Sequence, residues 1–172
     1  MMKFAIASLV FLLSACASNQ YVVQDPYSKA DVAAKIYEQK SEFGEHRIYG
    51  PVIEVSYGNM VIVDDLSVQL MKTENDNYYL RVHNYYQKDW KYLESITTLD
   101  KETIPLQEID RSVSICTQMA CNHTEIGFAP LSKTRYLTGM KDLKVRINGR
   151  RHGSMVVVLP KPYIQAFMER AE

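Results

Sequence analysis

The sequence predicts an all-β fold, mainly antiparallel, in the form of a single Ig-like β-sandwich with an N-terminal helix and a short C-terminal helix. From Arg47 onward, short segments of alternating apolar and polar residues recur with turn signals between them, a spacing typical of sandwiches and barrels. The chain has 172 residues, of which 47% are hydrophobic, so it can bury one core but is short for two. With 10% aromatic and 23% charged residues, its composition excludes wholesale disorder.

The spacing of apolar residues predicts an N-terminal helix over 29–42. Ser28 can cap its first turn, and Asp31, three residues later, is a weak capping-box partner. Two shorter helices are expected at 132–138 and 163–171, near the end of the chain. The apolar side chains that fall near one face of the first helix are those of Val32, Ile36 and Phe43.

The expected strands are short and rich in β-branched and aromatic residues. Asp64 and Asp65 are adjacent, so on a strand they would point to opposite faces, and we interpret them as a turn or kink rather than a catalytic pair. Turn signals at Gly58-Asn59, 75–77, 99–101 and Asn148-Gly149 separate the segments. The expected strands lie at 48–57, 60–63, 68–71, 78–86, 90–97, 103–109, 111–116, 121–129, 143–147 and 154–159.

Residues 1–15 have the pattern of a secretory signal peptide, with one basic residue, Lys3, before an apolar run from Phe4 to Leu13. The run is too short to span a bilayer as a permanent helix. It ends in Leu13-Ser14-Ala15-Cys16, which resembles the lipobox of bacterial lipoproteins. The alternative is an ordinary secretory signal in which Cys16 lies by chance.

The lipoprotein resemblance implies cleavage before Cys16, a diacylglyceryl group on its thiol and acylation of the new amino terminus. The mature chain would then carry three fatty acyl chains such as palmitate, and two or more chains give a stable membrane anchor. Ala17 and Ser18, in place of Asp, imply sorting to the outer membrane by resemblance to enterobacterial lipoproteins. Residues 16–28 would form the lipidated tether, and 29–172 a single domain that faces the periplasm.

Cys116 and Cys121 flank four residues, a spacing that places them opposite each other across a hairpin loop. Directly opposed strand residues lie within or near disulfide reach. In the periplasm, the default state of two nearby cysteines is a disulfide. We therefore predict a Cys116–Cys121 disulfide that closes the hairpin formed by 111–116 and 121–129.

The predicted disulfide fixes a register for this hairpin. Ser114 then faces His123, and Ser112 faces Glu125, on the same face as the two cysteines. The opposite face is more apolar, and we expect it to pack on the core. Its side chains are those of Val113, Ile115, Thr124 and Ile126, with Asn122 and Arg111 beside them.

A metal site is the alternative for the same hairpin. Reduced Cys116 and Cys121, together with His123 and Glu125, would offer sulfur, imidazole and carboxylate ligands suited to zinc or copper(I). The C-x4-C-x-H spacing is not a standard ligand pattern, and a disulfide removes both thiolates. We therefore predict a disulfide, with no metal ion and no cofactor.

Charge is distributed unevenly along a chain whose 20 basic and 20 acidic residues balance. Residues 133–151 hold seven basic residues and one acidic residue, whereas 42–110 hold 13 acidic and six basic residues. The interpretation we favour for the basic segment is a solvated strand face with charge that protects an exposed edge. The alternative is a patch for anionic lipid headgroups, lipopolysaccharide phosphates or an acidic partner, formed by Lys144, Arg146, Arg150 and Arg151.

The sequence contains no G-x-S-x-G, H-E-x-x-H, Walker or G-x-G-x-x-G motif. We therefore predict a non-catalytic, lipid-anchored binding, accessory or structural subunit of a periplasmic or outer-membrane assembly. Its expected partners are the membrane and an envelope protein, and not nucleic acid, because the net charge and the compartment disfavour it. The alternatives are a metal-binding or redox-sensitive protein that uses Cys116, Cys121 and His123, and an unrecognised periplasmic enzyme.

Overall fold

The computed structural model describes residues 28–42, 44–56, 64–87, 89–117, 120–139, 141–151 and 153–172. The lipobox-like segment with Cys16, nearly all of the tether, and the strand expected at 60–63 lie outside the described residues.

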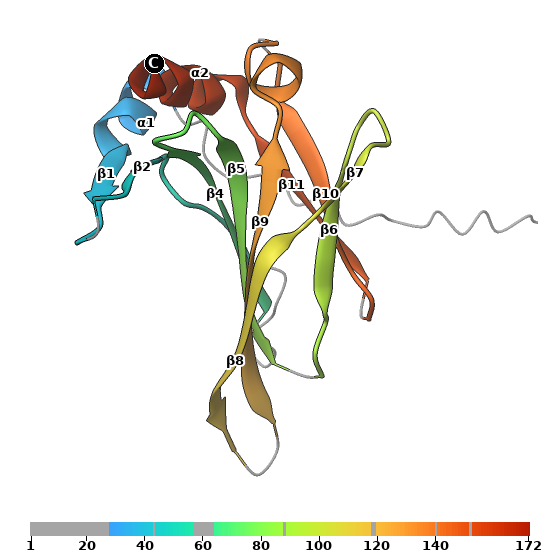
Figure 1. Ribbon diagram of the computed structural model, residues 1–172. Coiled ribbons are helices and arrows are strands. Elements are labelled where there is room, and N and C mark those ends of the chain that lie inside the picture. Colours follow the sequence, from blue (N-terminus) through green and yellow to red (C-terminus); the bar gives the residue numbers. More distant parts are fainter. Residues whose placement is uncertain are drawn as a thin grey trace, which may run out of the picture.

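The described chain forms two antiparallel sheets that face each other, with helices across one end (Figure 1). This architecture confirms the predicted all-β sandwich with small terminal helices. One sheet has seven strands in the order β1 (Tyr37–Lys40), β2 (His46–Tyr49), β4 (Asp64–Thr73), β5 (Tyr78–Gln87), β9 (Cys121–Leu131) and β8 (Gln107–Cys116), with β3 (Ile53–Ser56) also paired to β4. The other has four strands in the order β11 (Ser154–Leu159), β10 (Leu143–Gly149), β6 (Leu93–Thr98) and β7 (Thr103–Pro105). The helical elements are α1 (Lys29–Lys35), the π-helical turn η1 (Lys133–Leu137) and α2 (Lys161–Ala171).

Alternation of buried and more exposed side chains along β5, β10 and β11 builds much of the core between the sheets. Every second side chain of β5, from Tyr78 to Tyr86, is buried. Strands β10 and β11 repeat the pattern from the other side, with Val145 and Val157 directly opposed and buried. Because side chains on a strand point alternately to its two faces, these strands present an apolar face to the core. The polar side chains of these strands therefore lie on the outer faces of the two sheets.

The C-terminal helix α2 closes one end of the core. Tyr163 and Phe167 are fully buried, so the helix docks on the core. The Tyr163 hydroxyl donates to the carbonyl of Pro51 at 2.7 Å and accepts from the N–H of Leu70 at 3.2 Å. Gly50 leaves room for this contact, because a Cβ there would lie 2.4 Å from the Tyr163 oxygen.

The prediction of a helix over 29–42 is only partly correct. The Ser28 cap is present, with its side-chain oxygen accepting from the N–H of Asp31 at 3.1 Å. The helix nevertheless ends at Lys35, and 37–40 form the edge strand β1. Val32 is the one buried residue of α1, so the helical face has little to bury beyond it. Residues 37–40 instead pair with β2, and the Tyr37 and Tyr49 rings stack with their centroids 5.1 Å apart. These cross-strand contacts stabilise a strand more than the helical spacing of apolar residues stabilises a helix.

Two further expectations are wrong in detail. The strand predicted at 103–109 is interrupted at Leu106, where the chain leaves the four-stranded sheet and enters the seven-stranded one. Leu106 is buried and its N–H donates to the carbonyl of Glu94 at 2.8 Å. Asp64 and Asp65 do not form a turn but begin β4, opposite Tyr86 and Tyr85.

Candidate functional site

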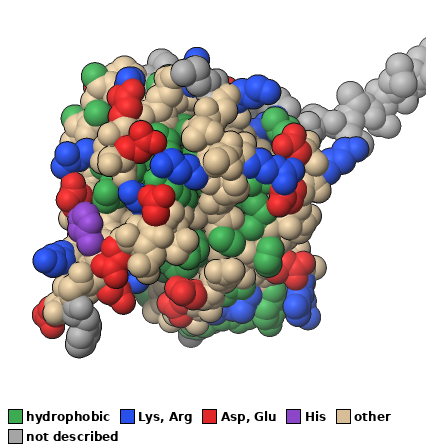
Figure 2. Space-filling model, turned by 45° about the horizontal axis from the view of Figure 1, so that its top comes forward, with side chains coloured by type: hydrophobic (Ala, Val, Ile, Leu, Met, Phe, Trp, Pro, Cys, Tyr) green, Lys and Arg blue, Asp and Glu red, His purple; other side chains and the backbone are tan. Residues whose placement is uncertain are grey.

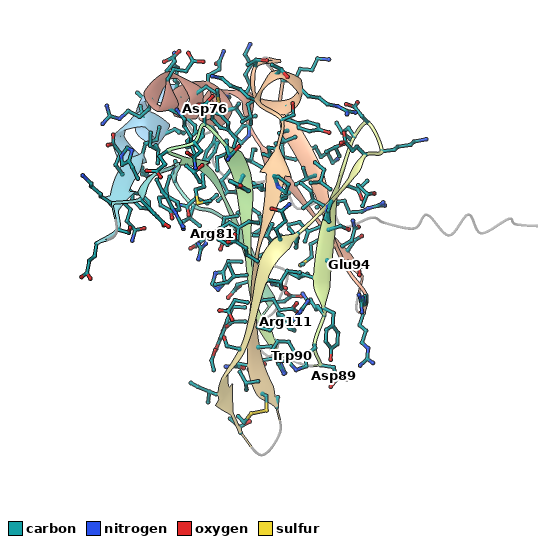
Figure 3. All side chains as sticks on the ribbon, in the orientation of Figure 1. Asp76, Arg81, Asp89, Trp90, Glu94 and Arg111 are labelled. Atoms are coloured by element: carbon teal, nitrogen blue, oxygen red, sulfur yellow. A yellow bond between two sulfur atoms is a disulfide. The ribbon has the colours of Figure 1, made fainter. Side chains whose placement is uncertain are left out.

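The β8–β9 hairpin extends beyond the end of the sandwich (Figure 1). Cys116 and Cys121 are joined by the predicted disulfide, with their Cα atoms 4.0 Å apart. Figure 3 shows the disulfide near the tip of the hairpin and Arg111 and Trp90 near its root. The hairpin is thus closed by a covalent bond at the end that lies farthest from the core.

The predicted register of this hairpin is correct for its first two pairs, Cys116–Cys121 and Ile115–Asn122, and wrong beyond them. Val113 is opposite His123 and Ile115 is opposite Asn122, so Ser114 is an additional residue in β8. Ser112 and Arg111 consequently lie opposite Thr124 and Glu125 in place of the partners expected from unbroken pairing. Such a bulge shifts the pairing of all following residues by one position, which exchanges the two faces of a strand.

The predicted buried face of the hairpin is also wrong. His123 and Glu125 point inward and are buried, whereas Val113 and Ile115 are 48% and 62% exposed. The expectation that Val113 and Ile115 pack on the core is therefore wrong. Val113 lies opposite His123 and Ile115 lies opposite Asn122, and these two adjacent residues of β9 point to opposite faces. Val113 and Ile115 therefore occupy opposite faces of the hairpin.

Glu125 forms the centre of a polar cluster at the hairpin root. Its carboxylate is fully buried and accepts from the N–H of Tyr92 at 2.9 Å and of Leu93 at 2.8 Å. It also accepts from Arg111 Nε at 3.0 Å and from the Tyr86 hydroxyl. Four donors converge on one carboxylate, which satisfies its charge and hydrogen-bonding capacity inside the protein. Glu125 therefore anchors β9 and β8 to the segment that leads into β6.

Aromatic and cationic side chains complete the root. The Trp90 ring meets His123 edge-on with centroids 4.4 Å apart, and Arg111 lies over the Tyr92 ring at 5.5 Å. Lys91 donates to Asp64 at 2.5 Å from the other side of the cluster. The hairpin is thus fixed at its root by packing and charge and near its tip by the disulfide.

The candidate metal ligands do not form a site. Cys116 and Cys121 are oxidised to a disulfide, and Glu125 is surrounded by hydrogen-bond donors. Across the described ranges, no group of three or more His, Cys, Asp or Glu side chains is placed to hold a metal ion.

Tyr86 gives this cluster a pH dependence. Burial raises the pKa of the Tyr86 phenol well above its ordinary value of 10.0, and its hydrogen bond to Glu125 raises it further. The protonated Tyr86 phenol makes its full contribution to the free energy of unfolding below pH 10. This contribution declines as the pH rises past 10, because the Tyr86 phenol ionises there in the unfolded chain but stays protonated in the folded chain. Urea unfolding measured from pH 8 to pH 11 should show stability that falls as the pH passes 10, and Tyr86→Phe should flatten that alkaline slope. An unchanged slope in Tyr86→Phe would refute the assignment.

The disulfide contributes to stability through the short loop that it closes. Replacing both Cys116 and Cys121 with Ser should lower the free energy of unfolding by about 2 kcal/mol, the amount expected for constraint of so small a loop in the unfolded chain. Urea denaturation of the double variant, compared with the wild type under oxidising and reducing conditions, measures this. Reduction should destabilise the wild type and leave the variant unchanged; equal sensitivity of both would contradict this prediction.

The predicted basic patch is divided by the structure. Arg150 pairs with Glu94 at 2.9 Å, and Arg151 lies over the Tyr92 ring at 5.5 Å. Lys144 and Arg146 instead line a separate groove of about 480 Å³ on the outer face of the four-stranded sheet, together with Lys101. Sequence reasoning missed Lys101 because a turn between β6 and β7 brings it to the groove from a distant part of the chain.

The chain matches no protein-family model, no curated protein and no solved structure. Among the helices of the described ranges, none has the length and apolar character needed to cross a bilayer.

Proposed function

We propose that this protein is a lipid-anchored envelope protein whose domain faces the periplasm from the outer membrane and acts as a non-catalytic binding or accessory subunit. The lipobox-like sequence ending in Cys16 supports the anchor and the compartment. The observation that carries the binding role is the projecting β8–β9 hairpin, which exposes Val113 and Ile115 while it is fixed at both ends.

The hairpin has the physical properties of a preformed binding element. An exposed apolar side chain gains free energy when a partner removes it from water. Fixing the hairpin before binding reduces the conformational entropy that association would otherwise remove. Because Val113 and Ile115 lie on opposite faces, the partner that fits is a protein with an apolar cleft that receives the hairpin from both sides.

Affinity capture from native envelopes tests this function. The lipidated wild type should recover a stoichiometric protein partner, and Val113→Asp and Ile115→Asp should both lose it. Val52→Asp is the matched control, because Val52 is 40% exposed and lies on a different part of the surface. Recovery of the same partner by all three variants, or of no partner by the wild type, would contradict the proposal.

The intact mass of the captured protein tests the anchor separately. The mature chain should begin at Cys16, carry the mass of its acyl groups and lack two hydrogens because of the disulfide. A chain that retains residues 1–15, or one without added lipid mass, would disprove the anchor whatever the outcome of the capture.

A further inference from the structure

The groove on the outer face of the four-stranded sheet brings together three cations from two separate segments of the chain. Arg146 and Lys144 come from alternate positions of β10, and Lys101 comes from the turn between β6 and β7. Thr97 and Val156 flank Arg146 as its direct partners on the two neighbouring strands. The resulting hollow of about 480 Å³ falls within the size range of small-molecule sites.

The groove has no internal source of negative charge. No acidic side chain lines it, and among the residues that the structure describes Lys101, Lys144 and Arg146 form no ion pair within 4.0 Å. The acids of the neighbouring turn, Asp100 and Glu102, both pair with Arg135 of η1. Figure 2 shows acidic and basic side chains intermixed over the face that it presents. The lining of the groove differs from this mixture, because it includes three cations and no acidic side chain.

Lys101 occupies an unfavourable backbone conformation. Its φ of +63° lies in the left-handed region, where glycine is tolerated better than any residue with a Cβ. A lysine there supplies a charge to the groove at a conformational cost. The hairpin turn fixes this conformation: the Lys101 N–H donates to the Thr98 carbonyl at 3.0 Å, and Asp76 has a φ of +60° in the equivalent turn between β4 and β5.

The lining of the groove includes the Thr97 hydroxyl, whose oxygen already accepts a hydrogen bond. The Asn148 side-chain amide donates to the Thr97 hydroxyl oxygen at 2.9 Å. The Thr97 hydroxyl hydrogen is then free to donate, either to Thr103, 3.4 Å away, or to a ligand. The groove therefore combines a guanidinium, two ammonium groups and a hydroxyl donor.

We propose that this groove binds a phosphate-bearing ligand through Arg146, Lys144 and Lys101. A guanidinium binds two phosphate oxygens at once, and the ammonium groups contribute point charges. At neutral pH a phosphate monoester carries about 1.5 to 2 negative charges and a pyrophosphate carries more, so either balances three cations better than a single carboxylate does. This inference is independent of the hairpin and of any partner protein that the hairpin binds.

Calorimetric titration of the full lipidated chain in neutral detergent with inorganic pyrophosphate tests the site. Arg146→Gln and Lys144→Gln should each weaken binding about tenfold, the loss typical of one charge-assisted contact. Lys40→Gln is the matched control, because it removes one exposed cation of β1 and should leave the affinity unchanged. Lys101→Gly should weaken binding as well while leaving the melting temperature equal or higher, because it relieves the left-handed backbone.

A second arm identifies the source of the phosphate. Phosphatidic acid added to the micelles should compete with pyrophosphate if a lipid headgroup enters the groove. It should leave pyrophosphate binding unchanged if the ligand is a soluble phosphate ester. Both results support the site. The proposal is overturned if pyrophosphate does not bind, or if the groove variants bind it as the wild type and Lys40→Gln do.

Discussion

Replacing Glu125 with Ala is expected to lower the free energy of unfolding by about 3 kcal/mol, because each buried donor left without its acceptor costs about 1–3 kcal/mol. The change leaves Arg111 without its carboxylate and leaves the N–H groups of Tyr92 and Leu93 without an acceptor. Because these groups join β9 and β8 to the start of β6, the hairpin root should loosen together with the core. Chemical denaturation measures the total loss, and hydrogen exchange of the β8 and β9 amides locates it.

The matched control for this change is Glu94→Ala. Glu94 also pairs with an arginine, Arg150, at 2.9 Å, but both side chains are exposed, so its loss should cost less than about 1 kcal/mol. Equal effects of the two substitutions would show that burial of Glu125 does not determine its contribution.

The second large effect is expected at the opposite end of the sandwich. Phe167→Ala should destabilise the fold by about 4 kcal/mol, because it leaves a cavity beneath α2 where the fully buried ring now packs. The ring also lies beside Gly50, so the loss should loosen the contact between α2 and the chain that enters β3. Thermal and urea unfolding measure the change.

Glu169→Ala serves as the comparison in the same helix. Glu169 is exposed and pairs with Lys29 of α1, and an exposed ion pair contributes little to stability. If Phe167→Ala lowered the free energy of unfolding as little as Glu169→Ala does, α2 would not be part of the core.

Local pattern was sufficient to predict several of the strands. Alternation along 78–86, 143–147 and 154–159 identifies β5, β10 and β11, because burial of one face imposes a period of two on the sequence. The disulfide follows from the separation of Cys116 and Cys121 along a hairpin. These features depend on residues that are close in sequence, so the sequence alone shows them.

The hairpin register could not be predicted in the same way. A charged Glu125 on a strand normally indicates a solvated face, and only the arrival of Arg111 and of the N–H groups of Tyr92 and Leu93 makes its burial favourable. The bulge at Ser114 accommodates that arrangement. Lys101 was missed for a related reason, since its place in the groove depends on a turn conformation and on strand order.

The most direct test of the proposed function is photo-crosslinking from position 115 in native envelopes. A photoreactive amino acid in place of Ile115 should give one reproducible adduct of discrete mass, and the same group in place of Val52 should not. That result is expected if the β8–β9 hairpin enters a cleft of one partner protein. The absence of an adduct at position 115, or the same adducts from both positions, would contradict the account.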